Sequence, residues 1–288
     1  MAGIGMNIVS FAGIFWLMAV AWAFSTNRRN VNGKLMFWGV ALQLLFAGFS
    51  LKDVFPSIAG HLVAASVLCA PASLVMSKLL LPEDGAPKTL GKAIHPFYER
   101  PSNVVEAVIT GSNDGVKLIV GIVALLLSVL GIVGVVDAAL GWLGGHVNHL
   151  AGFHGDWSMK ALLGYLFYPF TVMMGVPVHD AWAVSRIVGE RAVVTEVVAY
   201  NDLAAAMRQH LIADPRSVVI AAYALCGFAH VASAAIFIGG TAALAPGQTR
   251  VLARLGLRSL FAATLACLMA GCVAGVFYRG PSVLFGAP

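Results

Sequence analysis

GERAVVTEVVAYNDLAAAMRQHLIADPRSVVIAAYALCGFAHVAS, residues 189–233, places charged and helix-breaking residues inside an otherwise apolar part of the chain. Glu196 lies in the first apolar run of this stretch, and Gly227 interrupts the second run shortly before His230. An ionisable side chain at membrane depth is costly, so its presence there indicates a functional site. We therefore interpret the rest of the chain as a scaffold around this stretch.

The composition of the chain is that of a membrane protein. Of its 288 residues, 59% are hydrophobic and 11% are charged, and the mean hydropathy is +0.86. Soluble domains average about 25% charged residues. The net charge of +5 comes largely from basic residues in short loops, which orientation in the membrane explains, so we expect no nucleic-acid partner.

Six apolar runs are long enough to cross a bilayer, which takes about 20 residues of helix. They are residues 4–24, 35–51, 58–81, 116–142, 218–244 and 260–277. A seventh apolar region, residues 159–207, is interrupted by Pro169, Pro177 and several charged residues, so it does not resemble simple spans. The sequence thus predicts an all-α, polytopic membrane protein with about six transmembrane helices.

Two basic loops set the expected orientation. Residues 27–34 and 246–258 each contain three basic residues and no acidic one, which places both loops in the cytoplasm by the positive-inside rule. The number of spans between them fits only if residues 159–207 leave and re-enter the same face. We expect a re-entrant hairpin or an even number of crossings there, bordering a cavity, because irregular backbone at membrane depth needs such protection.

No cofactor site stands out. The cysteines lie in apolar runs without paired ligand spacing, and we interpret them as small buried hydrophobes. His146, His149 and His154 have a spacing that could bind a metal, but no carboxylate or cysteine completes the set. We interpret residues 144–156 as a solvated loop and assign no metal site.

Glu196 is the first candidate for ligand binding. It shares a helix face with Tyr200, four residues later. A carboxylate in a wall of low dielectric constant can accept hydrogen bonds from the hydroxyls of a polar solute. The alternative is that Glu196 forms a structural ion pair with Arg191 or Arg186.

His230 and Ser233 are the next candidates, because their spacing of three places them on one helix face. Phe228 offers an apolar surface beside them, and Gly227 allows the helix to unwind, as in the discontinuous helices of secondary transporters. The alternative for His230 is a core residue that is hydrogen-bonded to a carbonyl group.

Several blocks of the sequence resemble the concentrative nucleoside transporters. They are residues 24–32 (FSTNRRNVN), 42–49 (LQLLFAGF), 66–83 (SVLCAPASLVMSKLLLPE), 195–203 (TEVVAYNDL), 223–233 (YALCGFAHVAS) and 238–246 (IGGTAALAP). The resemblance implies that Glu196 binds the ribose of a nucleoside and that Phe228 and Ser233 line the same pocket. His230 stands where well-studied members carry asparagine, and Thr195 replaces the asparagine that commonly precedes the glutamate.

The sequence departs from this family in one large respect. The Gly-Gln-Thr-Glu tip of the family's first re-entrant hairpin has no counterpart, and the sequence around residues 51–54 joins blocks that normally flank that hairpin. We therefore expect an incomplete inverted-repeat transporter fold. Residues 1–52 form a two-helix scaffold, and residues 53–288 form the C-terminal region with its hairpin and broken helix.

The resemblance implies nucleoside symport with sodium or protons by alternating access, impaired in this short form, in a homotrimer in a bacterial inner membrane. A non-transporting membrane interaction or regulatory subunit, or a defective deletion form, is the alternative. No set of nucleophile, base and orienting group is present, so an enzyme is not expected.

Overall fold

The structure is a computed structural model that describes residues 2–50, 58–85, 101–152, 155–244, 246–278 and 280. Helices are the only regular elements in these ranges, in agreement with the predicted all-α class. They are α1 (Ala2–Ala23), η1 (Arg28–Asn30), α2 (Gly33–Ser50), α3 (Ile58–Leu80), α4 (Val104–Ala151), α5 (Met159–Met173), α6 (Val178–Glu190), α7 (Glu196–Arg208), α8 (Pro215–Leu225), α9 (Val231–Leu244), η2 (Pro246–Gln248) and α10 (Thr249–Phe277).

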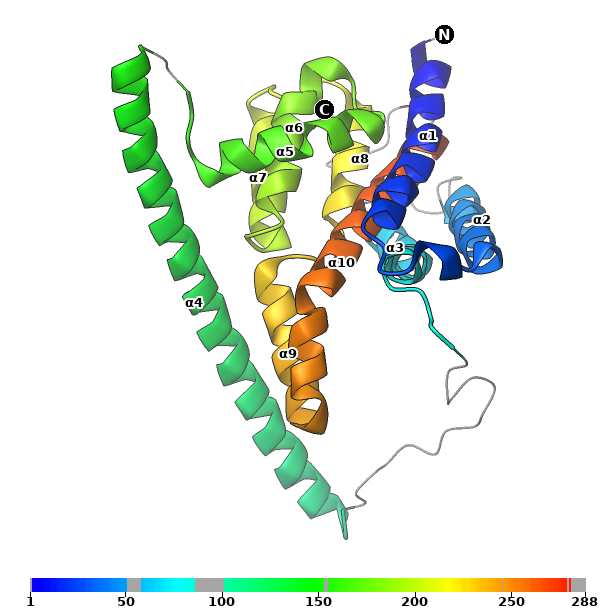
Figure 1. Cartoon of the computed structure of the whole chain (residues 1–288), viewed down its shortest axis with the longest axis vertical. Helices are drawn as coiled ribbons and strands as arrows, with labels where there is room; N and C mark the ends of the chain where they lie inside the picture. The colour runs from blue at the N-terminus through cyan, green and yellow to red at the C-terminus, as the bar shows by residue number, and fades with distance from the viewer. Residues whose placement is uncertain are drawn as a thin grey trace.

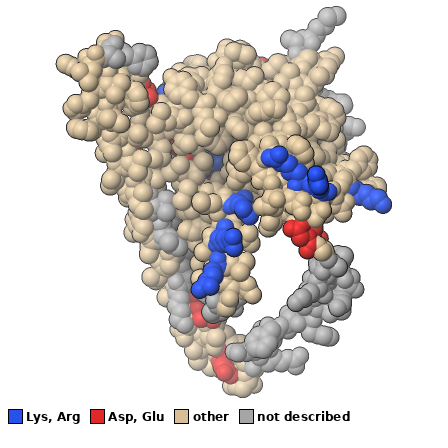
Figure 2. All heavy atoms as spheres, viewed as in Figure 1, with Lys and Arg blue, Asp and Glu red and all other residues tan. Residues whose placement is uncertain are grey.

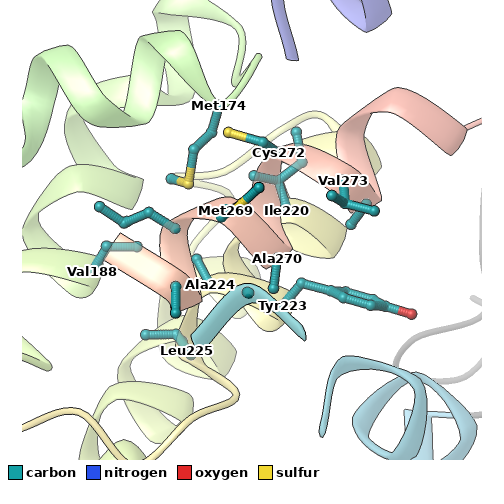
Figure 3. Packing of buried hydrophobic residues seen from close by; sticks show 14 of the residues in the cluster. Met174, Val188, Ile220, Tyr223, Ala224, Leu225, Met269, Ala270, Cys272 and Val273 are labelled. Atoms are coloured by element: carbon teal, nitrogen blue, oxygen red, sulfur yellow. The ribbon is translucent and has the colours of Figure 1, made fainter. Parts of the chain in front are cut away.

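Helix α10 lies at the centre of the fold and packs against α1, α3 and α8 (Figure 1). Its C-terminal half is buried continuously from Leu265 to Gly275, which is the pattern of a helix surrounded by other helices. Figure 3 shows Met269 and Cys272 of this helix packed with Ile220 of α8 and with Met174. The broken helix is thereby held against the centre of the molecule.

Helices α5 and α6 form an antiparallel hairpin that supports the site. A Cβ atom added at Gly164 would lie 2.7 Å from Arg186 Cγ, and one at Gly189 would lie 2.8 Å from the backbone of Leu163. These glycines let the two helices approach closely, as small residues do in membrane bundles. The hairpin turns at Gly175, whose φ of +87° favours glycine.

A buried carboxylate fixes the start of α8. Asp180, in the first turn of α6, is 1% exposed and accepts hydrogen bonds from the backbone N–H groups of Ala213 and Asp214, both at 3.0 Å. It also accepts from the Ser217 hydroxyl at 2.6 Å. Because these donors would otherwise lack partners at the helix N-terminus, Asp180 ties the broken helix to the hairpin.

The second residue of α8 is a buried arginine that joins four parts of the chain. Arg216 is 3% exposed and donates to the Gly175 carbonyl at 2.8 Å, to the Ser10 hydroxyl at 2.7 Å and to the Gly275 carbonyl at 3.0 Å. Its charge is stabilised by these oxygens rather than by a buried acid. The contacts connect α8 with α1, α10 and the turn after α5.

Four described helices contain segments that are long and apolar enough to cross a membrane: Ile4–Ala23, Gly60–Leu80, Leu130–Leu150 and Thr249–Phe277. Shorter apolar helices are Gly33–Ala47, Pro215–Leu225 and Val231–Ala242. The last two correspond to the single span predicted for residues 218–244, which is broken near Gly227 as its sequence indicated. The predicted total of six spans stays a prediction.

Two predicted boundaries are wrong. Helix α4 extends over 48 residues and begins after Asn103, whose side chain accepts a hydrogen bond from the Glu106 N–H at 2.9 Å. It therefore includes His146 and His149, which we had expected in a solvated loop; His154 lies outside the described residues. Helix α10 begins at Thr249, so most of the basic run 246–258 is helical. A helix forms its own backbone hydrogen bonds both inside and outside a membrane. The end of an apolar run in the sequence therefore does not locate the end of the helix.

The predicted re-entrant segment consists of α5, α6 and α7. These helices have 15, 13 and 13 residues, fewer than the roughly 20 that a span requires. Re-entry into the membrane stays a prediction. So does the division of the chain at residues 52 and 53, because residues 51–57 lie outside the described ranges.

Candidate functional site

The candidate site lies where two helix interruptions meet. The first is the segment 191–195 between α6 and α7, and the second is the segment 226–230 between α8 and α9. The N–H of Val231 donates to the Ala192 carbonyl at 3.1 Å, and Arg191 Nη2 donates to the Gly227 carbonyl. Each interruption frees backbone groups that the other one satisfies, so the two segments fix each other in place.

Arg191 is the buried centre of this contact. Its side chain is 1% exposed, and besides the Gly227 carbonyl it donates to Cys267 Sγ of α10 at 3.0 Å. A Cβ atom added at Gly227 would lie only 2.3 Å from that sulfur, so glycine is needed for the close approach. Cys267 thus contributes a polar contact and is more than the small hydrophobe that its sequence context predicted.

His230 and Ser233 cap the start of α9 reciprocally. The Ser233 N–H donates to His230 Nδ1 at 3.1 Å, and the His230 N–H donates to the Ser233 hydroxyl oxygen at 2.9 Å. This is the arrangement of a capping box, with histidine and serine in place of its usual residues. Because Nδ1 accepts a hydrogen bond, the neutral imidazole carries its proton on Nε2.

His230 Nε2 points at the carboxylate of Glu196, the first residue of α7. The distance from Nε2 to Oε2 is 3.1 Å. Its geometry is not that of a hydrogen bond, and both atoms are buried without a hydrogen-bond partner in the described part of the chain. Unsatisfied buried polar atoms are costly, which makes this pair a place where a polar ligand would be stabilised.

Phe228 lies at the edge of the same site. Its ring packs edge-to-face against His230 at a centroid distance of 5.0 Å and against Phe237 at 5.6 Å. The side chain is 46% exposed, so part of the ring is open. The open part offers an apolar surface beside the polar pair.

The structure brings together all four predicted residues, but their side chains differ in exposure to solvent. Glu196 is 30% exposed at its side chain, whereas His230 and Ser233 are each 1% exposed. The Ser233 hydroxyl donates to the His230 carbonyl at 2.6 Å, so its hydrogen is used within the helix start. The Tyr200 hydroxyl donates to the Ala222 carbonyl of α8 at 2.7 Å and supports the position of α7.

The alternative ion pairs of Glu196 are not found among the described residues. Arg191 contacts a carbonyl and a thiol, and Arg186 pairs with Asp156 at 2.8 Å. The Ser158 hydroxyl and N–H, followed by Arg186, hold the pKa of the Asp156 carboxyl below its usual value. Both arginines therefore have other structural roles.

Three buried polar residues that organise the site were missed as functional candidates: Arg191, Arg216 and Asp180. Each is a charged residue beside an apolar run, which was the only signal in the sequence. That signal did not distinguish a charged residue in an exposed loop from a buried one, because the hydrogen-bond partners of the buried residues come from distant elements. Within the described ranges, no group of three or more His, Cys, Asp or Glu residues could hold a metal ion.

Two family models cover most of the chain. The model of the Na⁺-dependent nucleoside transporter C-terminus matches residues 61–275, and that of the N-terminus matches residues 12–59. The chain belongs to the Na⁺-dependent nucleoside transporter family. This confirms the resemblance seen in the sequence, and it confirms that the chain is not an enzyme, because the family consists of transporters.

The chain is similar to two curated members of this family. It is 36% identical over 234 residues to solute carrier family 28 member 3 of Mus musculus, a match that covers 77% of this chain and 33% of that protein. It is 32% identical over 240 residues to sodium/nucleoside cotransporter 1 of Homo sapiens, covering 78% and 36%. The chain thus spans about a third of the length of these nucleoside transporters.

The fold is also that of a solved structure. A CNTnw double variant in an outward-facing state matches with a TM-score of 0.72, over 94% of this chain and 98% of that chain. Sequence identity in this match is 20%, so the match shows the fold alone. Together with the apolar helices, the family places the chain among multi-pass membrane proteins.

Proposed function

We propose that this chain takes part in the transport of nucleosides across a membrane by cation symport. The observation that carries the proposal is the approach of Glu196 Oε2 to His230 Nε2, 3.1 Å apart and without hydrogen-bond partners among the described residues. A carboxylate acceptor and an imidazole donor at this separation can bind one ribose hydroxyl or two neighbouring ones.

The four site residues have different roles in this proposal. Glu196 accepts hydrogen bonds from the ribose hydroxyls, and His230 donates one through Nε2. Phe228 packs its exposed ring face against the nucleoside. Ser233 acts through His230, because its hydroxyl caps the same helix start and orients the imidazole.

Transport proceeds by alternating access in this proposal, and sodium is the coupling ion. The name of the matched family and that of the human cotransporter support sodium. Protons are the alternative coupling ion, because the imidazole of His230, which lies beside the Glu196 carboxylate, is a group that can carry a proton.

A complete transporter site is built where two repeats face each other. This chain has the hairpin and the broken helix of one repeat, and the tip motif of the other hairpin is missing from its sequence. We expect ribose contacts to persist and transport by the chain alone to be impaired. The alternative, a non-transporting membrane subunit or a defective deletion form, would bind partners through its helices and move no nucleoside.

A homotrimer in a bacterial inner membrane completes the proposal. Helix α4 supports assembly, because its apolar segment Leu130–Leu150 is almost entirely exposed in the single chain. At about 1.5 Å per residue, its 48 residues extend well beyond the bilayer. Chemical crosslinking of the protein in membranes would show trimers, and a purely monomeric pattern would contradict this part of the proposal.

The test of function is uptake of radiolabelled uridine and adenosine into vesicles that contain the chain, with and without a sodium gradient. Glu196→Gln should abolish uptake, while Glu83→Gln, an exposed acid remote from the site, should not change it. Direct binding of uridine to the purified protein separates the two hypotheses. Uridine binding that Glu196→Gln removes supports the nucleoside site even without uptake, whereas no binding by folded protein contradicts it.

A further inference from the structure

One face of the molecule gathers basic side chains from four elements, η1, α2, α3 and α10. The loop after α1 lies against the end of α3, because the Thr26 N–H donates to the Leu80 carbonyl at 3.0 Å. Among the described residues of this region, Glu83 is engaged by Lys78, and Asp84 by Asn27 and Asn30. Figure 2 shows the lysines and arginines of this region as two neighbouring groups on one face of the molecule. The basic residues are Arg28, Arg29, Lys34, Lys78, Arg250, Arg254 and Arg258.

The arginines of α10 carry charges without a local counterpart. Arg250, Arg254 and Arg258 follow each other at intervals of four residues, so they lie along one face of the helix. All three are exposed and have no acidic partner within the described residues. An unpaired row of guanidinium groups at the end of a membrane helix is suited to bind anions.

A cleft between α3 and α10 lies beside these basic residues, and Lys78 and Arg258 line it. Its volume is about 190 Å³, and its polar lining comes from Ser77, Lys78, Arg258 and Ser259. Leu81 and Leu255 are among the leucines that form its apolar wall. The cleft therefore combines two cationic groups with an apolar surface at one place.

The level of the cleft along the helices indicates which anion fits it. The apolar segment of α3 ends at Leu80, and the part of α10 that follows Arg258, residues 259–277, contains no charged residue. Arg258 and Lys78 thus lie where both helices leave the hydrocarbon. Lipid phosphates occupy this level of a bilayer, and their acyl chains would follow the leucine wall.

The hydroxyl groups of the cleft are used locally. Ser77 donates to the Leu74 carbonyl at 3.2 Å, and Ser259 donates to the Gly256 carbonyl at 2.7 Å. The donors left for a ligand are the Arg258 guanidinium and the Lys78 ammonium, which also pairs with Glu83. A guanidinium group binds phosphate oxygens through two parallel N–H groups.

We propose that the cleft between the end of α3 and Arg258 of α10 binds the phosphate of an anionic phospholipid. The neighbouring arginines, Arg250 and Arg254, add long-range attraction to the anionic membrane surface. Basic pockets of this kind between membrane helices favour anionic over zwitterionic head groups. The bound lipid bridges α3 and α10 and stabilises the packing of the central helix.

The experiment compares lipids with the purified full chain in detergent. Phosphatidylglycerol should raise the midpoint temperature of thermal unfolding, and phosphatidylcholine at the same concentration should not. Inorganic phosphate is added alone to distinguish a lipid from a free anion. Native mass spectrometry then counts the phosphatidylglycerol molecules that stay bound.

Arg258→Gln should weaken phosphatidylglycerol binding about fivefold, the effect of removing one basic residue near the surface. The matched control is Arg208→Gln, an exposed arginine in the last turn of α7, which should bind as the native protein does. Arg258→Lys keeps the charge and should retain most of the binding. Lys78→Gln tests the same cleft from α3 if Arg258→Gln fails to fold.

Unchanged binding in both Arg258→Gln and Lys78→Gln would overturn the proposal. Equal stabilisation by phosphatidylcholine, or by inorganic phosphate alone, would also overturn it, because the site would then not select an anionic lipid. These measurements need no nucleoside and no transport, so their result is independent of the proposed function.

Discussion

His230 Nε2 lies 3.1 Å from Glu196 Oε2, across the contact between two interrupted helices. The other ring nitrogen of His230 is held by the Ser233 N–H at the start of α9. One imidazole therefore has two separable roles, since Nδ1 caps a helix and Nε2 faces the carboxylate. Substitutions at this position can remove one role and keep the other.

His230→Asn and His230→Ala should differ both in stability and in uridine binding. Asparagine is a good helix cap, so His230→Asn should unfold near the native temperature, while His230→Ala loses about 1 kcal/mol. His230→Ala also loses the donor that faces Glu196 and should bind uridine less tightly, whereas asparagine keeps an amide N–H donor and should retain more of the binding. Thermal unfolding and titration calorimetry of the purified protein measure the two effects. Equal destabilisation by both variants would contradict the capping role.

Arg191→Met should destabilise the contact between the two interruptions. It leaves the Gly227 carbonyl buried without its donor, which costs about 1–3 kcal/mol. Arg191→Lys retains a charge but not the fork of donors, so it should recover only part of the loss. Arg208→Met, at an exposed position in α7, is the control. Equal unfolding midpoints for Arg191→Met and Arg208→Met would refute the role of Arg191 in this contact.

Gly227→Ala should be destabilising because its Cβ would lie 2.3 Å from Cys267 Sγ. Overpacking of this kind costs about 1–3 kcal/mol. Removal of the sulfur by Cys267→Ala should relieve the clash, so the double variant should be more stable than the sum of the two single changes predicts. A double-mutant cycle of unfolding free energies measures this coupling. If the changes in unfolding free energy of the two single variants simply add up in the double variant, contact with the sulfur is not the reason for glycine at position 227, and the backbone conformation is.

Arg216→Met should be the most damaging of these changes. The side chain is 3% exposed and supplies donors to the Gly175 and Gly275 carbonyls and to the Ser10 hydroxyl. Losing these three buried hydrogen bonds at about 1–3 kcal/mol each should remove much of the stability of an ordinary domain, which is about 5–15 kcal/mol. We expect low yield and early proteolysis compared with Arg208→Met. A folded, protease-resistant variant would disprove this role.

The sequence predicted the interruptions but not how they are joined. Gly227 within an apolar run and Glu196 after a polar cluster located both, and the spacing of His230 and Ser233 placed them on one face. The hydrogen bond from Arg191 to the Gly227 carbonyl could not be predicted from the sequence, because the two residues lie 36 positions apart in the chain. The predicted lengths of α4 and α10 were too short. An apolar run marks only the part of a helix that lies in the membrane, and both helices continue beyond their apolar runs.

By itself, the amino-acid sequence determined that the chain is an all-α membrane protein and which family it resembles. These properties follow from composition, from apolar periodicity and from short local blocks, and none of them needs a distant contact. Only the tertiary structure decided which buried charges organise the site and that Glu196 faces His230. The reason is physical: a buried polar group must find its partner in space, and here those partners come from helices far apart in the sequence.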